Sequence, residues 1–193
     1  VGWFENDGTP YKDDWIFHPL NLDPISGANE VDYGDIDGDG DMDVAVTSYS
    51  QHYVYWLENV GGPKMIWNSY SVGRMYYAQG VGVEDFDGDG DAEIVASAGY
   101  YYNYGVRLYY SNNPRSSFSV KTLTSATYCG VINITDMNLD GHPDILVPIN
   151  GYSGQAVIFR NPLYSQSSIL STWTAITAVG GLQYSHECRP IDI

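Results

Sequence analysis

The chain has 193 residues, of which 44% are hydrophobic, enough for one domain with a buried core. Its 24 Asp and Glu residues against 8 Lys and Arg residues give a formal net charge of −16, which argues against nucleic acid or anionic membranes as partners and in favour of cations. No apolar run reaches the roughly 20 residues of a transmembrane helix, and we expect any signal peptide to lie outside this sequence.

Short alternating segments, typical of β-strands, recur along the whole chain. We expect strands at residues 1–6, 15–18, 43–46, 54–59, 65–68, 81–84, 93–96, 106–111, 118–121, 144–147, 156–161 and 173–176. No stretch predicts a helix. The segments 43–46, 93–96 and 144–147 are almost entirely apolar, as strands covered on both faces are.

Two elements repeat in step about every fifty residues. The acidic segment 35–43 recurs at 85–93 and 136–144, and a fourth copy begins at residues 192–193. The segment 54–59, which contains Trp-Leu-Glu-Asn, matches residues 1–6 and has weaker copies at 106–111 and 156–161. Four short strands per repeat predict the blades of a β-propeller, strands a to d in chain order, with the acidic loop between a and b.

The predicted organisation is a single all-β propeller domain or fragment over residues 1–193, with about four blades' worth of chain. The expected repeats are 1–30 (a partial blade), 31–80, 81–127, 128–180 and 181–193 (the start of the next blade). Propellers usually need more blades to close, so a piece of a longer propeller is one interpretation. The other is a complete short chain whose terminal strands together form a blade, within one molecule or between several.

Each acidic loop carries the alternating carboxylates that a calcium site needs. Ca²⁺ takes six to eight oxygen ligands at about 2.3–2.6 Å, and alternating residues of a tight loop aim their side chains at one centre. We therefore predict three calcium sites. The predicted side-chain ligands are Asp35, Asp37, Asp39 and Asp43, then Asp85, Asp87, Asp89 and Glu93, then Asp136, Asn138, Asp140 and Asp144, with backbone carbonyls from Asp41, Asp91 and His142.

A solvated acidic turn without metal is the simplest alternative, and charge repulsion argues against it. Clustered carboxylates repel one another, and no loop contains a Lys or Arg to offset them. The third loop has one carboxylate fewer, so we expect weaker affinity there. An EF-hand is excluded because loop position 12 is Val46, Ala96 or Val147 instead of Glu, and because strands flank the loops. The number of ligands in each loop disfavours magnesium.

The loops DIDGDGDMD, DFDGDGDAE and DMNLDGHPD, with the segments WFEN and WLEN, resemble the FG-GAP or VCBS repeats of the integrin α-subunit propeller and of many secreted bacterial and fungal proteins. The resemblance covers nearly the whole chain and implies a seven- or eight-bladed propeller with calcium in its a–b loops. The departures are Glu93, Asn138 and the weak copies at 106–111 and 156–161. They bear on the affinity of individual sites.

The predicted role of calcium is structural, because protein oxygens supply nearly all of its ligands. Such loops suit the millimolar calcium outside cells, so we expect a secreted, extracellular protein. The sequon at Asn133 would fit that compartment, although it lies in a predicted inner strand. Cys129 and Cys188 lack the spacing of a zinc or thioredoxin-type site, and a disulfide and two buried thiols both remain open.

The turns at the other end of the blades are rich in tyrosine, and exposed aromatic rings offer flat apolar platforms for sugars. The candidate ligand-binding residues are Tyr49, His52, Tyr53, Tyr100, Tyr101, Tyr102, Tyr104 and Tyr152. The alternative is that these rings simply pack between blades. Trp3, Trp56 and Trp67 lie in predicted strands and are assigned to the core.

No catalytic motif is present, so we predict a binding module for carbohydrate recognition or adhesion and not an enzyme. The alternatives are a structural protein that self-associates through open blade edges, and the scaffold fragment of a polysaccharide-active enzyme. Expected partners are calcium and a glycan or an extracellular protein.

Overall fold

The computed structural model describes residues 1–6, 8–9, 15–20, 25–62, 66–100, 104–150, 154–164, 168–181 and 187–189. These residues form fourteen β-strands and one short 3-10 turn, Pro162–Tyr164. The strands make one two-stranded and three four-stranded antiparallel sheets, which confirms the predicted all-β fold of four-stranded blades. Within these ranges no helix has the length and apolar character to cross a membrane.

The first sheet pairs β1 (Gly2–Glu5) with β2 (Ile16–Pro19). The second contains β3 (Ala28–Gly34), β4 (Asp43–Ser48), β5 (Tyr53–Asn59) and β6 (Trp67–Arg74). The third contains β7 (Ala78–Glu84), β8 (Glu93–Ala98), β9 (Val106–Tyr110) and β10 (Ser119–Thr124). The fourth contains β11 (Asn133–Thr135), β12 (Asp144–Ile149), β13 (Gln155–Arg160) and β14 (Thr174–Gly180).

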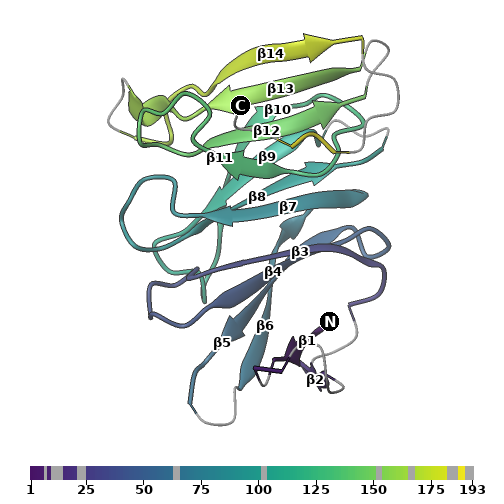
Figure 1. Ribbon diagram of the computed structural model, residues 1–193, viewed down its shortest axis with the longest axis vertical. Coiled ribbons are helices and arrows are strands. Elements are labelled where there is room, and N and C mark those ends of the chain that lie inside the picture. The colour runs from purple at the N-terminus through teal and green to yellow at the C-terminus, as the bar shows by residue number, and fades with distance from the viewer. Residues whose placement is uncertain are drawn as a thin grey trace.

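Strands follow one another within each sheet in chain order, so hairpins connect all neighbours. Each four-stranded sheet therefore has strand a (β3, β7 or β11) at one edge. The sheets are stacked along the long axis of the molecule, from β1–β2 to β11–β14 (Figure 1). The edge strand β7 contacts β3 on one side and β11 on the other, so the three a strands lie beside one another. This is the arrangement of successive propeller blades.

The core lies between the sheets, which explains why the b strands are apolar throughout. Side chains of a strand alternate between its two faces. In β4, Val46 packs with Leu57 on the side of β1–β2, whereas Ala45 packs with Val83 and Ile94 of the next sheet. A third cluster joins the third and fourth sheets through Val95, Leu108, Ile145 and Phe159.

The tryptophan predictions agree with this packing. Trp56 in β5 is fully buried and stacks on Tyr70, with ring centroids 4.7 Å apart. Trp3 and Trp67 are half-buried against the cluster between the first two sheets. Burial of a side chain of this size contributes about 3–5 kcal/mol, judged by the usual cost of truncation to Ala. Trp56 therefore anchors the contact between the second and third sheets.

The two cysteines are both free thiols. Cys129 is buried in the cluster between the third and fourth sheets, and burial raises the pKa of its thiol to about 12. A thiol with so high a pKa carries almost no thiolate at neutral pH and is a poor nucleophile. Cys129 therefore serves packing.

Candidate functional site

All three acidic loops join strands a and b, so they lie at the same end of the sheets. Residues 35–42 connect β3 to β4, residues 85–92 connect β7 to β8, and residues 136–143 connect β11 to β12. The first two loops are in contact, because the Ala92 amide donates a 2.8 Å hydrogen bond to the Asp35 carbonyl. The acidic groups of these two loops thus lie side by side.

The first Asp of each loop holds the turn in shape through its carboxylate. Asp35 accepts hydrogen bonds from the amides of Asp39 (3.1 Å) and Gly40 (2.9 Å). Asp85 and Asp136 accept the equivalent bonds in their own loops. The turn needs a left-handed residue where Gly38 and Gly88 stand, and the third loop has Leu139 there at φ 61°. A non-glycine residue in this conformation costs roughly 1–2 kcal/mol, so the third loop is strained.

The first three acids of loops one and two converge. In each triad, one carboxylate oxygen from every residue lies within 4.8 Å of the others; the triads are Asp35, Asp37, Asp39 and Asp85, Asp87, Asp89. Burial and the neighbouring Asp39 raise the pKa of Asp37, and burial with Asp89 and Asp85 raises that of Asp87. Asp37 Oδ1 is also buried without a hydrogen-bond partner among the described residues. Converging oxygens that are unfavourable when charged fit a cation, so both triads can hold a metal ion.

The last acid of each loop also accepts hydrogen bonds from backbone amides, a role that the sequence did not reveal. Asp43 is buried, and its two oxygens accept hydrogen bonds from the amides of Asn59 (2.8 Å) and Ile36 (3.2 Å). Asp144 accepts the same pair of bonds, from the amides of Asn161 and Met137. These carboxylates thus connect the loop to the Asn that ends strand c, which explains the Asn of Trp-Leu-Glu-Asn.

Glu93 occupies the equivalent position in the second loop. It is buried and accepts a 3.1 Å hydrogen bond from the Phe86 amide. Burial, with the Asp87 charge, raises the pKa of Glu93 to about 8. For Asp43, burial raises the pKa to about 6. A nearby cation would lower both values, because it favours the ionised form.

The remaining predicted ligands lie within their loops as well. The amide of each seventh loop residue donates to the carboxylate of the fifth, from Asp41 to Asp39, from Asp91 to Asp89 and from His142 to Asp140, at 3.0–3.1 Å. Asn138 donates a 3.2 Å hydrogen bond to Asp144 Oδ2. Whether each of these residues binds metal stays a prediction.

Two arginines supply positive charge that the loops themselves lack. Arg115, from the turn between β9 and β10, places Nη2 2.5 Å from Asp37 Oδ2, and it also pairs with the buried Glu58. Arg160 of β13 lies 3.1 Å from Asp140. The loops contain no Lys or Arg of their own, as the sequence shows, but in the folded chain two of them receive a guanidinium from another strand or turn. Among the described residues, the first and third loops form ion pairs with these arginines and the second loop forms none.

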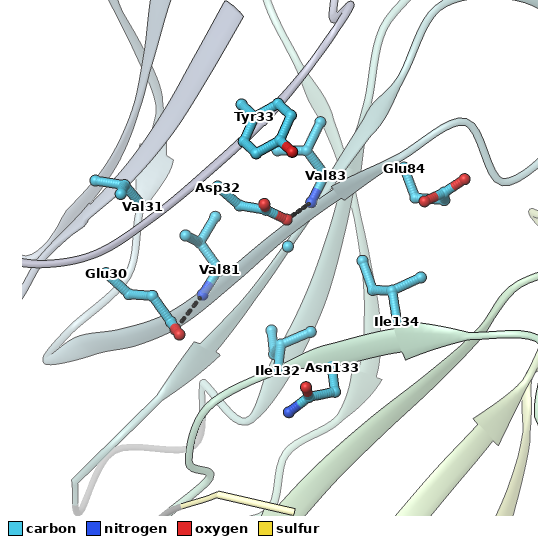
Figure 2. Close-up of a pocket in the computed structure, with 11 residues that line it drawn as sticks. Glu30, Val31, Asp32, Tyr33, Val81, Val83, Glu84, Ile132, Asn133 and Ile134 are labelled. Atoms are coloured by element: carbon cyan, nitrogen blue, oxygen red, sulfur yellow. Dashed lines mark hydrogen bonds between the residues drawn. The ribbon is translucent and has the colours of Figure 1, made fainter. Parts of the chain in front are cut away.

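The a strands line a separate pocket of about 450 Å³ (Figure 2). Glu30 and Asp32 of β3 accept hydrogen bonds from the amides of Val81 (3.0 Å) and Val83 (2.8 Å) of β7, shown as dashed lines. Burial raises the pKa of Glu30 to about 7 and also raises that of Asp32. On the far side of the pocket, the side-chain nitrogen of Asn133 is buried, which leaves no room for a glycan on it.

An aromatic cluster lies at the other end of the strands from the metal loops. We call it the aromatic face; its rings are Tyr49, His52, Tyr76, Tyr77, Tyr100, Tyr104 and Tyr128. The rings of Tyr49, Tyr77, Tyr100 and Tyr128 follow one another with centroids 5.0–5.7 Å apart. Tyr49 and Tyr100 are 39% and 40% exposed, so part of this surface is open to a ligand.

Four of the predicted ligand-binding residues belong to the aromatic face: Tyr49, His52, Tyr100 and Tyr104. Tyr53 instead packs on Tyr55, with centroids 5.9 Å apart. Tyr101, Tyr102 and Tyr152 lie outside the described residues. The turns between strands d and a add Tyr76, Tyr77 and Tyr128, which we did not predict.

Comparison with known families identifies the repeat. The family model of the FG-GAP-like repeat matches residues 35–96 and again residues 85–147, which together span more than half of the chain. Each match runs from one acidic loop into the strand after the next loop. A search of the curated proteins finds no match to this chain.

Proposed function

Given that the chain belongs to the FG-GAP-like repeat family, we propose that it is a calcium-stabilised β-propeller module of the extracellular space that binds carbohydrate. FG-GAP-like repeats are typically extracellular, and their acidic loops often hold calcium. Secretion is part of the same proposal, since loops with the affinity of extracellular modules would be filled by the calcium outside cells.

The convergence of Asp35, Asp37 and Asp39, repeated in the second loop, is the observation that carries the calcium proposal. The donors are hard oxygens only, which suit Ca²⁺ and exclude soft metals. Bound calcium would stabilise the turn between strands a and b of each sheet, because it binds the folded loop and not the unfolded chain.

Calorimetric titration of the calcium-free protein tests this proposal. We expect about three calcium ions per chain with affinities in the range of extracellular modules, and much weaker magnesium binding because Mg²⁺ demands near-ideal octahedral geometry. Heat-induced unfolding should shift to higher temperature with calcium. Titrations without saturable calcium binding, at any concentration up to that of extracellular fluid, would overturn the proposal.

The aromatic face supports the second part of the proposal, carbohydrate binding. Tyr rings provide rigid apolar area with a polar tip, which suits a sugar ring whose faces are apolar and whose edge carries hydroxyls. The partly exposed Tyr49 and Tyr100 are the surfaces on which a sugar would stack. Substitution of Tyr100 by Ala should weaken glycan binding at least tenfold.

A matched control separates this effect from a general loss of tyrosine. Tyr33 is 69% exposed but lies on β3 at the pocket of the a strands, away from the aromatic face. Tyr33→Ala should leave glycan binding unchanged. A glycan array without binding to the wild-type protein, or equal losses in the two variants, would contradict carbohydrate binding at this face.

We propose further that the module acts by binding and not by catalysis. Its converging carboxylates belong to the metal loops, and Glu30 and Asp32 are engaged by backbone amides of β7. A bound oligosaccharide should therefore remain intact on prolonged incubation. Release of new reducing ends would show an enzyme instead.

A further inference from the structure

Two arginines stand on the aromatic face, each stacked on a tyrosine ring. Arg74, at the end of β6, has its guanidinium carbon 4.4 Å from the centroid of the Tyr76 ring. Arg107, in β9 of the next sheet, has its guanidinium carbon 4.1 Å from the Tyr104 centroid. The two tyrosine rings are themselves 5.4 Å apart. We call Arg74 and Arg107 the arginine pair.

The two arginines are also close to one another across the boundary between the second and third sheets. Arg107 Nη1 donates a long hydrogen bond of 3.5 Å to the Arg74 carbonyl. The Arg74 side chain is exposed, whereas Arg107 is half-buried. Each guanidinium is thus held by stacking on its own tyrosine ring, and the two rings are neighbours across the boundary between the sheets.

Among the residues that the structure describes, the arginine pair has no carboxylate partner, although the chain has a net charge of −16. Arg115, Arg160 and Arg189 each form an ion pair with Asp or Glu. In contrast, no carboxylate of the described residues lies within 4 Å of Arg74 or Arg107. Within the described part of the chain, the charge of both arginines is therefore left for a partner from outside.

We propose that the arginine pair selects saccharides that carry an acidic group, a carboxylate or a sulfate. This inference rests on the proposed carbohydrate-binding function of the aromatic face and names the class of sugar. A guanidinium that stacks on a ring uses its flat face, and its N–H groups remain at the edge. Those edges form the planar fork that binds carboxylate and sulfate oxygens through charge-assisted hydrogen bonds.

The acidic loops do not prevent this recognition, because they lie at the other end of the strands. The six residues of β8 separate the second loop from the turn that carries the aromatic face, a rise of roughly 20 Å at about 3.3 Å per residue. The Debye length at physiological ionic strength is about 8 Å, so the loop charges are largely screened at that distance. Calcium in the loops would reduce their charge further.

Three hexasaccharides that differ only in the group at C6 test the proposal. They are β-1,4-linked glucose, β-1,4-linked glucuronic acid, and the glucose hexamer sulfated at C6. Each is titrated calorimetrically into the calcium-loaded protein, with a blank titration into calcium buffer alone. We expect at least one acidic hexamer to bind ten to a hundred times more tightly than the neutral one, and the comparison shows whether carboxylate or sulfate is preferred.

Substitution of the exposed arginine then localises the effect. Arg74→Gln should reduce the preference for the acidic hexamer at least fivefold and leave the neutral hexamer within twofold. Arg74→Lys, which keeps the charge but loses the fork, should lie between Gln and wild type. Arg189→Gln, which removes the same charge outside the aromatic face, should bind like wild type. Because Arg74 is exposed, these variants should fold, and their melting temperatures check this.

The other outcomes contradict either the role of the arginine pair or carbohydrate binding itself. Equal affinity for the neutral and acidic hexamers, or a preference that survives Arg74→Gln, overturns the role of the arginine pair and leaves carbohydrate binding standing. If none of the three hexamers binds to the wild-type protein, carbohydrate binding at this face is overturned and the inference falls with it.

Discussion

The substitution Asp87→Asn should change stability in opposite directions with and without calcium. One carboxylate oxygen each from Asp85, Asp87 and Asp89 lies within 4.8 Å of the others. At that separation a pair of like charges costs about 1 kcal/mol in a water-like dielectric. Asp87 is exposed, so this lower value applies to its two pairs. Without calcium, the neutral Asn should therefore raise the free energy of unfolding by about 1–2 kcal/mol.

With calcium present the sign reverses. A site that binds only the folded chain contributes about 2.7 kcal/mol at a hundredfold excess of ligand over Kd. Asn keeps an oxygen in the loop but loses the negative charge, so most of that contribution should disappear. The second loop is the best place for this test, because its acids are outside the ion pairs of the described residues. We expect the variant to be about 1–2 kcal/mol less stable than wild type in calcium.

Denaturant unfolding in calcium and in chelator measures both changes in the free energy of unfolding. Asp91→Asn is the control, because Asp91 lies in the same loop but is predicted to contribute only its backbone carbonyl. Asp91→Asn should relieve charge repulsion in chelator and lower the free energy of unfolding only slightly in calcium. A stability change of Asp87→Asn with the same sign and size in both solutions would refute the metal site in this loop.

Three further outcomes are expected. Arg115→Gln should raise the calcium affinity of the first loop several-fold by calorimetry, since the guanidinium 2.5 Å from Asp37 opposes an incoming cation; unchanged affinity would show that Arg115 moves aside freely. The raised pKa of Glu30, about 7, means that the folded state holds a proton that the unfolded chain releases above pH 4.5. Stability from this group is therefore full below pH 4.5 and lost as the pH rises through 7. Glu30→Gln should be about 1 kcal/mol more stable than wild type at pH 8, after solvent screening is allowed for, and equal to it at pH 4; a parallel pH profile would contradict this. Trp56→Ala should lower the free energy of unfolding by about 3–5 kcal/mol with calcium present, and a loss below about 1 kcal/mol would show that Trp56 does not anchor the sheets.

The blades could be predicted because their signals are local and repeat. Alternating hydrophobicity places strands to within a few residues, and the acidic loops set the phase of each unit. The ends of the strands were less accessible. β6 extends from Trp67 to Arg74, well past the predicted 65–68, and it pairs with β5 over that length. Tyr70 and Val72 alternate with Ser69 and Ser71, so the sequence carried a strand signal there that the prediction did not use.

The arginines at the metal loops could not be predicted from local sequence patterns alone. Arg115 reaches Glu58 across 57 residues, and only the packing of one sheet on the next brings them together. Arg160 was accessible in principle, since the repeat aligns it with Glu58 at the same place in strand c. That alignment puts a charged residue beside the loop in both repeats, but with opposite sign.

The aromatic face was half predictable for a similar reason. The turns between strands b and c were predicted as the binding surface because tyrosines cluster there in the sequence. The turns between d and a carry fewer tyrosines, yet Tyr77 and Tyr128 are 51 residues apart and share a left-handed backbone, with φ of 54° and 58°. Repeat spacing, applied to single residues, was the signal that would have found them.

The carboxylates of Glu30 and Asp32 bear on aggregation. An edge strand with free amides is a template onto which a strand of another molecule can add. Two carboxylates, spaced two residues apart on β3, cover the amides of Val81 and Val83 on the edge of β7. A foreign strand would have to displace both of these side-chain acceptors before pairing there. These two side chains thus hinder the addition of a further strand to the edge of β7, as would occur in a fibril.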